Sequence, residues 1–252
     1  MSKYQKISDW CILSNETDGH MLEHAKTEIL NCRWHEGYVD DIIMPYFLTS
    51  NRRTVIDIGA SYGWMAVSFA KYFDKVNCFE IRDDVRYALR ENTSRFPNVE
   101  IYNCGLSDKD ANVRIDIDNT TTGTTKIIRE RIKQPNKSGH DRRLDFGPAK
   151  EWNQKYDSST QARVTTLDSF NFTNVDCIKM DIENHEYYAL LGAIKTIKKW
   201  KPVLILEISY TAKRYFELFE PRQRIFKLLH SLDYQMVDAR GRDFIFSHKT
   251  LA

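Results

Sequence analysis

The sequence predicts an α/β fold, in which a mostly parallel seven-stranded sheet has an antiparallel edge and helices on both faces. The first observation behind this prediction is a repeated order of short apolar runs and stretches with helical spacing. The second is a pair of closing segments around Arg240-Gly241-Arg242, which is typical of a β-hairpin. Strand–helix–strand units give parallel strands with right-handed crossovers, so the hairpin supplies the antiparallel edge.

The composition is that of a soluble globular protein of 252 residues, a length that suits one domain. We expect a helical appendage over residues 1–50 and a main domain over residues 51–252, with a polar insert at about 119–160. The formal charge of +2 is too small to favour nucleic acid or a membrane surface as a partner. No apolar run reaches the roughly 18 residues of a membrane-spanning helix, and the first residues lack the apolar centre of a signal peptide.

Five cysteines are scattered along the chain, and no pair has zinc-ligand spacing. Cys78 and Cys177 fall within predicted buried strands. Reduced core cysteines are typical of a reducing compartment, so the sequence predicts a cytoplasmic location.

The first 50 residues carry two amphipathic segments. Apolar residues recur at near-helical spacing over residues 20–32, which predicts a helix, and a second helix is expected over residues 36–48, ending near Pro45. These helices would pack on the sheet or cover a ligand cleft. Three histidines of this region are interpreted as solvated helix residues rather than ligands: His20, His24 and His35.

Next comes a buried strand over residues 54–58, a glycine turn and a helix over residues 62–72. The unpaired backbone N–H groups of a first helical turn make such a junction a ligand site. Gly59 and Gly63 lack the third glycine of a dinucleotide fingerprint, and the Gly-Lys-Ser/Thr of a P-loop is absent. An ordinary βα turn is one interpretation of what remains.

The other interpretation is that the turn resembles motif I of the class I methyltransferases, which bind S-adenosylmethionine. The resemblance implies that Asp57 faces the cationic methionyl amino group through water. It also implies that Gly59 lets the methionine portion lie against the chain. The cofactor-binding turn would then consist of Asp57, Gly59, Ala60, Ser61 and Gly63.

The following strand–helix–strand unit supplies side chains for an adenosine. Glu80 stands about 20 residues after the glycine turn, where a carboxylate can accept hydrogen bonds from both ribose hydroxyls. Ile81 would pack on the adenine face, and Asn103 would meet the adenine edge. A solvated acid at a strand end is the alternative for Glu80. The expected elements are strands over residues 75–80 and 99–103 and a helix over residues 84–95.

A polar segment interrupts the pattern after a strand at residues 112–118. Residues 119–160 are rich in Thr, Lys, Arg, Asn, Gly and Ser, so this segment is either a solvated surface or a lid that recognises the acceptor. The remaining expected elements are strands over residues 161–165, 175–180 and 202–208, helices over residues 187–197 and 221–232, and the hairpin of residues 234–237 and 243–247.

Acidic residues follow several of these strands. Open α/β sheets bind ligands beyond the carboxyl ends of their strands, so these side chains should meet at one edge. Their shared field should raise the carboxylate pKa values, whereas a bound divalent metal would lower them. The cluster consists of Asp57, Glu80, Asp181, Glu183, His185 and Glu207.

The order of the later motifs resembles the FkbM-type methyltransferase family. The motifs are Val164-Thr165-Thr166-Leu167-Asp168-Ser169, Asp176 to Glu186, Leu190-Leu191-Gly192-Ala193 and Pro202 to Glu207. The resemblance implies a Rossmann-like class I methyltransferase fold and S-adenosylmethionine-dependent O-methylation of a sugar, glycan or natural-product hydroxyl. Asn184 replaces the glycine that the family usually has, and asparagine tolerates left-handed geometry.

Several roles remain open at this point. His185 or Asp181 would take the proton of the acceptor hydroxyl, while Glu183 and Glu207 would orient the acceptor or the histidine. His185 could instead cap the following helix, and a divalent metal is an open possibility. The alternative functions are an NAD-dependent sugar-modifying enzyme and a non-catalytic nucleotide- or nucleic-acid-binding adaptor. We expect a small-molecule or glycan acceptor and disfavour nucleic acid.

Overall fold

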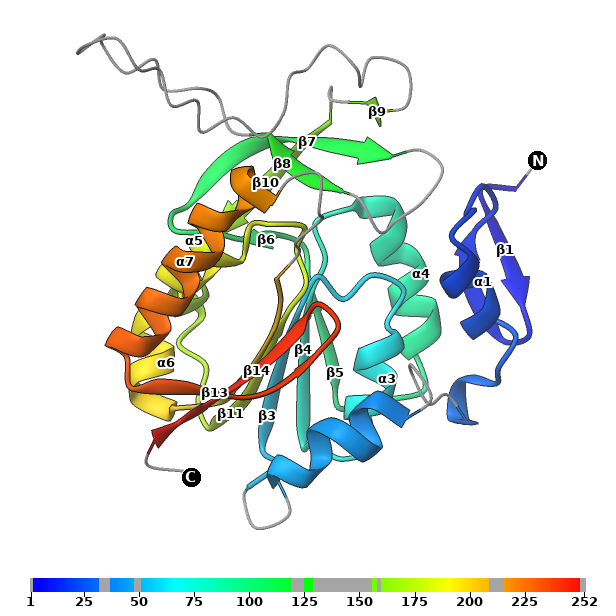
Figure 1. Cartoon of the computed structure of the whole chain (residues 1–252). Helices are drawn as coiled ribbons and strands as arrows, with labels where there is room; N and C mark the ends of the chain where they lie inside the picture. Colours follow the sequence, from blue (N-terminus) through cyan, green and yellow to red (C-terminus); the bar gives the residue numbers. More distant parts are fainter. Residues whose placement is uncertain are drawn as a thin grey trace, which may run out of the picture.

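The computed structural model describes residues 2–31, 37–47, 51–118, 125–128, 156–157, 160–208 and 215–249. Its centre is a seven-stranded sheet with the strand order β13-β14-β12-β11-β3-β4-β5 (Figure 1). The strands are β3 (Thr54–Ile58), β4 (Lys75–Phe79), β5 (Val99–Tyr102), β11 (Val175–Met180), β12 (Val203–Glu207), β13 (Tyr234–Arg240) and β14 (Asp243–His248).

The sheet is mixed, as the sequence pattern indicated. Strands β5, β4, β3, β11 and β12 pair in parallel, whereas β14 is antiparallel to both β12 and β13. Every residue of β3 and β12 is buried, because helices cover both faces of these strands. The carboxyl ends of β3, β4, β11 and β12 therefore meet along one edge.

Helices form a layer on each side of the sheet (Figure 1). On one face, α5 (Glu186–Leu191), α6 (Ile194–Trp200) and α7 (Tyr215–Ser231) cover the core that contains Ile56 and Ile178. On the other face, α3 (Trp64–Ala70) packs on Val55 and Cys177. Successive residues of one strand thus belong to different cores, as the two-residue period of a strand requires. Helix α4 (Asp83–Thr93) lies beside α3.

Three helix boundaries differ from the predicted ones. Helix α3 starts at Trp64 because Gly63, at its N-cap, has a φ of +95°. The helix expected over residues 187–197 is two helices, and a Cβ on Gly192 between them would lie 2.0 Å from the carbonyl oxygen of Ser107. Helix α7 begins at Tyr215, ahead of the Pro221 that the prediction used as its start.

The N-terminal segment departs most from the prediction of a helical appendage. It opens with a hairpin of β1 (Tyr4–Ile7) and β2 (Trp10–Leu13). Two residues join these short strands, and Ser8 between them has a φ of +53°, so the hairpin has a two-residue turn. The expected helix over residues 20–32 is the shorter α1 (Gly19–His24) followed by a 3₁₀ turn, η1 (Ile29–Asn31).

The second expected N-terminal helix, over residues 36–48, consists of two irregular turns in the described part. They are the π-helix η2 (Tyr38–Ile43) and the 3₁₀-helix η3 (Met44–Phe47). Cys32 and His35 lie outside the described residues. The other four cysteines, Cys11, Cys78, Cys104 and Cys177, are buried and free.

Side chains from the main domain fix the hairpin in place. Asn92 of α4 accepts a hydrogen bond from the backbone N–H of Cys11 at 2.6 Å and donates one to its carbonyl at 3.0 Å. Its amide therefore serves β2 as a neighbouring strand would. Trp10 and Trp64 pack with ring centroids 3.8 Å apart.

A second sheet, which the sequence did not predict, lies across one end of the main sheet (Figure 1). The strands expected at residues 112–118 and 161–165 are present, but they pair with each other here. Most of the polar insert, and with it the predicted lid, lies outside the described residues. The sheet consists of β6 (Gly105–Leu106), β7 (Ala111–Asp118), β8 (Lys126–Ile128), β9 (Tyr156–Asp157) and β10 (Gln161–Thr165).

Candidate active site

A cavity of about 390 Å³ opens at the carboxyl ends of β3, β4, β11 and β12. We divide its wall into two halves. The glycine half consists of Gly59, Ala60, Ser61, Glu80 and Ile81, and the acid half consists of Lys179, Asp181, Glu183, Glu207 and Arg242. The rim is completed by Asp18, His20 and Met21 of the N-terminal segment, by Thr125 and Ile127 beside β8, and by Asp243.

Backbone contacts shape the glycine half. The N–H groups of Gly59 and Ala60 both donate to the carbonyl of Phe79, at 2.9 and 3.1 Å. Gly59 has a φ of +81°, and a Cβ there would lie 1.9 Å from the carbonyl oxygen of Asp181. A glycine is therefore required at residue 59 because the end of the neighbouring strand β11 lies so close to it, whether or not a ligand is bound. Gly63 does not line the cavity, and its missing Cβ leaves room for Leu89.

Glu80 holds the turn together from β4. Its Oε2 accepts a hydrogen bond from the Ser61 N–H at 2.9 Å, and its Oε1 accepts one from the Arg82 N–H at 2.9 Å. Burial raises the pKa of Glu80, while these two hydrogen bonds oppose the rise. A carboxylate has about four acceptor sites, so Glu80 keeps acceptor capacity for a ligand hydroxyl.

The structure does not bring Asn103 to this cavity. Asn103 lines a separate depression with Tyr102 and Cys104, whereas Gly105 and Leu106 reach the main cavity. Ile81 does line the main cavity, where its side chain packs close to Gly105.

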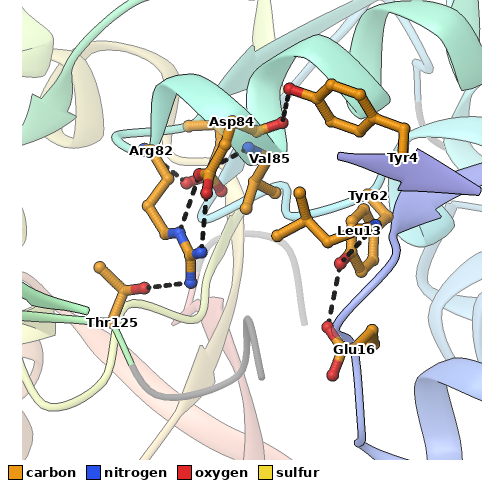
Figure 2. A network of polar contacts seen from close by, with 9 residues as sticks. Tyr4, Leu13, Glu16, Tyr62, Arg82, Asp84, Val85 and Thr125 are labelled. Atoms are coloured by element: carbon orange, nitrogen blue, oxygen red, sulfur yellow. Dashed lines mark hydrogen bonds and ion pairs between the residues drawn. The ribbon is translucent and has the colours of Figure 1, made fainter. Parts of the chain in front are cut away.

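A polar network ties the glycine half to the two peripheral parts of the molecule (Figure 2). Arg82 donates to both carboxylate oxygens of Asp84, at 3.1 and 3.0 Å, and to the hydroxyl of Thr125 at 3.3 Å. On the other side, the Tyr62 hydroxyl donates to Glu16 at 2.9 Å and accepts from the Leu13 N–H at 3.2 Å. The cavity wall is thus braced by the second sheet and by the N-terminal segment.

Asp57 lies beneath the acid half. It is fully buried and does not line the cavity, and neither carboxylate oxygen has a hydrogen-bond partner in the part of the chain that the structure describes. Burial raises its pKa, and Lys179 opposes the rise. The Lys179 ammonium lies 3.6 Å from Asp57 Oδ1, so the cation beside Asp57 in this structure is a residue of the protein.

Lys179 itself was missed by the sequence analysis. The available signal was a lysine inside an otherwise apolar strand, since lysine is almost never fully buried without a partner. Its ammonium lies 3.6 Å from Asp181 Oδ2 and donates to the Gly59 carbonyl at 3.4 Å. Burial lowers the pKa of Lys179, but Asp181 and Asp57 outweigh it and raise the pKa, so the side chain stays cationic.

Asp181 and Glu207 share a hydrogen bond, and their pKa values are shifted in opposite directions. Burial would raise the pKa of Asp181, but Lys179 and the hydrogen bond from Glu207 lower it overall. Burial and Asp181 raise the pKa of Glu207, although Arg242 lies 2.7 Å away. The prediction of uniformly raised carboxylate pKa values is therefore wrong for Asp181, because a buried cation faces it.

The turn after β11 contains two successive left-handed residues, Glu183 with a φ of +55° and Asn184 with a φ of +73°. Asparagine thus does take the glycine-like geometry that was expected of it. Glu186 closes the turn, because its Oε1 accepts from the N–H groups of Ile182 and Asn184 at 3.1 and 3.3 Å. Burial, followed by the charge of Asp181, raises the pKa of Glu183 to about 7.

His185 points away from the cavity. Its Nε2 lies 3.0 Å from the Ser107 hydroxyl, its ring packs on Tyr188, and it does not line the cavity. It occupies the N-cap position of α5 without a side-chain cap hydrogen bond. Within the described ranges, no group of three or more His, Cys, Asp or Glu side chains could hold a metal ion.

The donor set fits S-adenosylmethionine, a cationic nucleoside. Six carboxylate side chains line the cavity against two permanent cations, so its field favours a positive ligand. Glu80 is available for ribose hydroxyls, and the buried Ser61 hydroxyl has no hydrogen-bond partner among the described residues.

Among the helices that the structure describes, none has both the length and the hydropathy that a membrane span needs.

Comparisons with known proteins agree with this geometry. The model of the methyltransferase FkbM domain matches residues 57–236, well over half of the chain. The crystal structure of methyltransferase FkbM from Methylobacillus flagellatus KT is 15% identical with a TM-score of 0.53. The match covers 93% of this chain but only 56% of that protein, and at this identity it shows the fold alone.

Two more distant structures add no argument. A SAM-dependent methyltransferase from Aquifex aeolicus is 12% identical with a TM-score of 0.44, over 82% of this chain and 87% of that one. Aeropyrum pernix fibrillarin with bound S-adenosyl-L-methionine is 9% identical with a TM-score of 0.42, over 81% and 70%. No curated protein matches the sequence significantly. The family model nevertheless covers the glycine turn, Glu80 and the acid half up to Glu207, and the chain therefore belongs to the FkbM family of S-adenosylmethionine-dependent methyltransferases.

Proposed function

We propose that the protein is an O-methyltransferase that acts on a hydroxyl of a sugar, a glycan or a small natural product. The observation that carries the proposal is a part-exposed carboxylate, Asp181, beside the Lys179 ammonium in the wall of a cavity whose other half suits the cofactor nucleoside. A hydroxyl acceptor must lose a proton as it takes up the methyl group. The carboxylate supplies a place for that proton.

The glycine half would hold the nucleoside end of the cofactor. Glu80 accepts hydrogen bonds from the ribose hydroxyls, and Ile81 packs on the adenine face. Both line the cavity on the β4 side. When bound, S-adenosylmethionine supplies an electrophilic methyl group on its sulfonium, and the protein contributes alignment and a base.

Asp181 is our candidate for the base. Its side chain is 40% exposed, so an acceptor hydroxyl can reach it, and its lowered pKa keeps it ionised at neutral pH. The raised pKa of Glu207 favours a hydrogen bond from Glu207 to Asp181, and this bond would orient the accepting oxygen. Glu183 lies on the same wall and would contact the acceptor. His185 is not in reach of the cavity in this structure, so we assign it a supporting role behind the turn.

The test is methyl transfer from S-adenosylmethionine to a panel of nucleotide sugars, glycans and small phenols. Removing a positioned base costs on the order of a hundredfold to ten-thousandfold in rate. Asp181→Asn should therefore lose that much turnover on any acceptor that the wild type methylates, while calorimetry shows S-adenosylhomocysteine still bound. His185→Ala is the matched control, because its imidazole contacts Ser107 instead of the cavity.

Two results would overturn the proposal. Full turnover of Asp181→Asn at saturating cofactor would remove this carboxylate from the chemistry. Binding of NAD, with none of S-adenosylhomocysteine, would favour the alternative of an NAD-dependent sugar-modifying enzyme.

A further inference from the structure

Lys179 and Asp57 are placed together by the register of the main sheet. They are direct partners across the parallel strands β11 and β3. Alternate residues of a strand share a face, so Asp181 follows Lys179 on the same side of the sheet. The ammonium therefore lies between one carboxylate beneath the cavity floor and one in its wall, 3.6 Å from each.

The two carboxylates differ in what surrounds them. Asp57 is 0% exposed and has no hydrogen-bond donor among the described residues, so the Lys179 ammonium balances its buried charge. Asp181 is part-exposed to the cavity and also receives the hydrogen bond from Glu207. A buried charge is costly unless it is paired, and this arrangement pairs Lys179 on both sides. The salt bridge to Asp57 thus fixes where the ammonium stands relative to Asp181.

We propose that Lys179 is a positioning residue whose ammonium, anchored by Asp57 and the Gly59 carbonyl, holds the Asp181 carboxylate as an anion facing the acceptor. The inference rests on the proposed role of Asp181 as the base. It assigns the motif I acid a structural task, since Asp57 anchors the lysine and does not contact the ligand. The proton balance is simple, because Asp181 receives the hydroxyl proton and the Lys179 ammonium stays protonated throughout.

Other charged groups also face this pair, and the test has to separate them from Lys179. Glu207 and Arg242 approach Asp181 from β12 and from the turn before β14, and Asp243 faces the lysine from β14. Glu183 approaches from the turn after β11. Besides Lys179, the titratable groups that act on Asp57 or are acted on by it include Asp181 and the thiols of Cys78 and Cys177. A substitution at residue 179 leaves all of these side chains in place.

The experiment is an NMR titration of side-chain carboxyl carbons in the full chain, with the Asp181 signal assigned by Asp181→Asn. Lys179→Met removes the charge, and we expect the Asp181 midpoint to rise by at least about one pH unit, a tenfold change in proton affinity. Lys179→Met leaves Asp57 as an unpaired buried charge and can unfold for that reason. The double variant Asp57→Asn/Lys179→Met removes both charges and keeps the measurement possible.

Lys179→Arg is the matched control, because it retains a cation and should keep the Asp181 midpoint within a few tenths of a unit. An unchanged midpoint in both methionine variants overturns the inference. Calorimetry with S-adenosylhomocysteine should show a change in affinity below about threefold, since the glycine half is intact, and a loss above about thirtyfold would make Lys179 a ligand contact instead. A shifted midpoint in a protein that methylates no acceptor would support this inference while the proposed function fails.

Discussion

The two halves of the cavity are held in place by different interactions. The glycine half is fixed by backbone hydrogen bonds to Phe79 and by Glu80, which binds two backbone N–H groups. The acid half is fixed by charges, with Lys179 between Asp57 and Asp181. Backbone geometry does not depend on pH, whereas buried charges do. Changes in the glycine half should therefore act through shape, and changes in the acid half should act through protonation.

The largest effect should come from Gly59→Ala, which disturbs the contact between Gly59 of the glycine half and Asp181 of the acid half. The new Cβ would lie 1.9 Å from the Asp181 carbonyl, so strand ends β3 and β11 would have to separate. We expect a loss of roughly 4 kcal/mol or more of unfolding free energy, at the upper end for one substitution. Urea denaturation measures it.

Gly241→Ala is the control for this prediction. Gly241 also has a positive φ, of +61°, but a Cβ there would meet nothing within 4 Å. Only the left-handed strain remains, about 1–2 kcal/mol. Equal losses in the two variants would mean that contact with Asp181 does not decide the role of Gly59.

An intermediate effect is expected for Glu80→Ala. The substitution removes the ribose acceptor and also leaves the Ser61 and Arg82 N–H groups without their partner. We expect S-adenosylhomocysteine affinity to fall by about 1–3 kcal/mol, the range for hydrogen bonds to charged groups. Calorimetry at two pH values at which Glu80 is ionised should give the same loss, since the substitution then removes the same hydrogen bonds at both. A loss that varies with pH would break the distinction between the halves.

Glu80→Gln sharpens this prediction. Glutamine keeps one acceptor oxygen, so either the Ser61 or the Arg82 N–H retains a partner. Its affinity should fall between wild type and Glu80→Ala. Affinity as low as that of the alanine variant would mean that the charge, not the hydrogen bonding, matters here.

The smallest effect concerns the pH dependence of stability. Burial raises the pKa of Glu186 to about 8 and that of Glu183 to about 7, above the ordinary value of 4.5. Between pH 4.5 and these raised pKa values, the folded state binds more protons than the unfolded state. The free energy of unfolding should therefore fall as the pH rises from about 5 to about 8. Glu186→Gln should flatten the fall by roughly 1–3 kcal/mol between about pH 5 and about pH 8.

Urea unfolding across that pH range is the measurement, and Glu100→Gln is the control because Glu100 is an exposed residue of β5. The glutamine at residue 186 can still accept the Ile182 and Asn184 hydrogen bonds. If the free energy of unfolding of Glu186→Gln depends on pH as that of the wild type does, Glu186 is not the buried group that binds the extra proton in the folded state.

The main sheet was predictable because its central strands are largely buried and therefore rich in apolar residues. Strands β3 and β11 have the predicted bounds, and so does β10 of the second sheet. The N-terminal hairpin was not predictable in this way. Its outer strand β1 is only half buried, and its inner strand β2 is completed by the Asn92 side chain, a contact 81 residues distant.

The site was predictable only as far as strand ends determine it. Asp181, Glu183, Glu207 and Glu80 do meet in one cavity, because parallel strands end at one edge. Their protonation was not predictable, since it depends on Lys179, which reaches Asp181 from within the strand. The direction of a side chain after a turn is equally hidden, and the left-handed pair at residues 183 and 184 turns His185 toward Ser107.

The second sheet has a consequence for the evolution of this enzyme. Thr125 and Ile127 reach the cavity rim from strand β8 and its approach, and β8 pairs with β7, not with any strand of the main sheet. Substitutions there can reshape the rim without shifting the register that aligns Asp57 with Lys179. The rim can therefore change independently of that register, and directed evolution toward new acceptors should begin at Ile127, since Thr125 also accepts a hydrogen bond from Arg82.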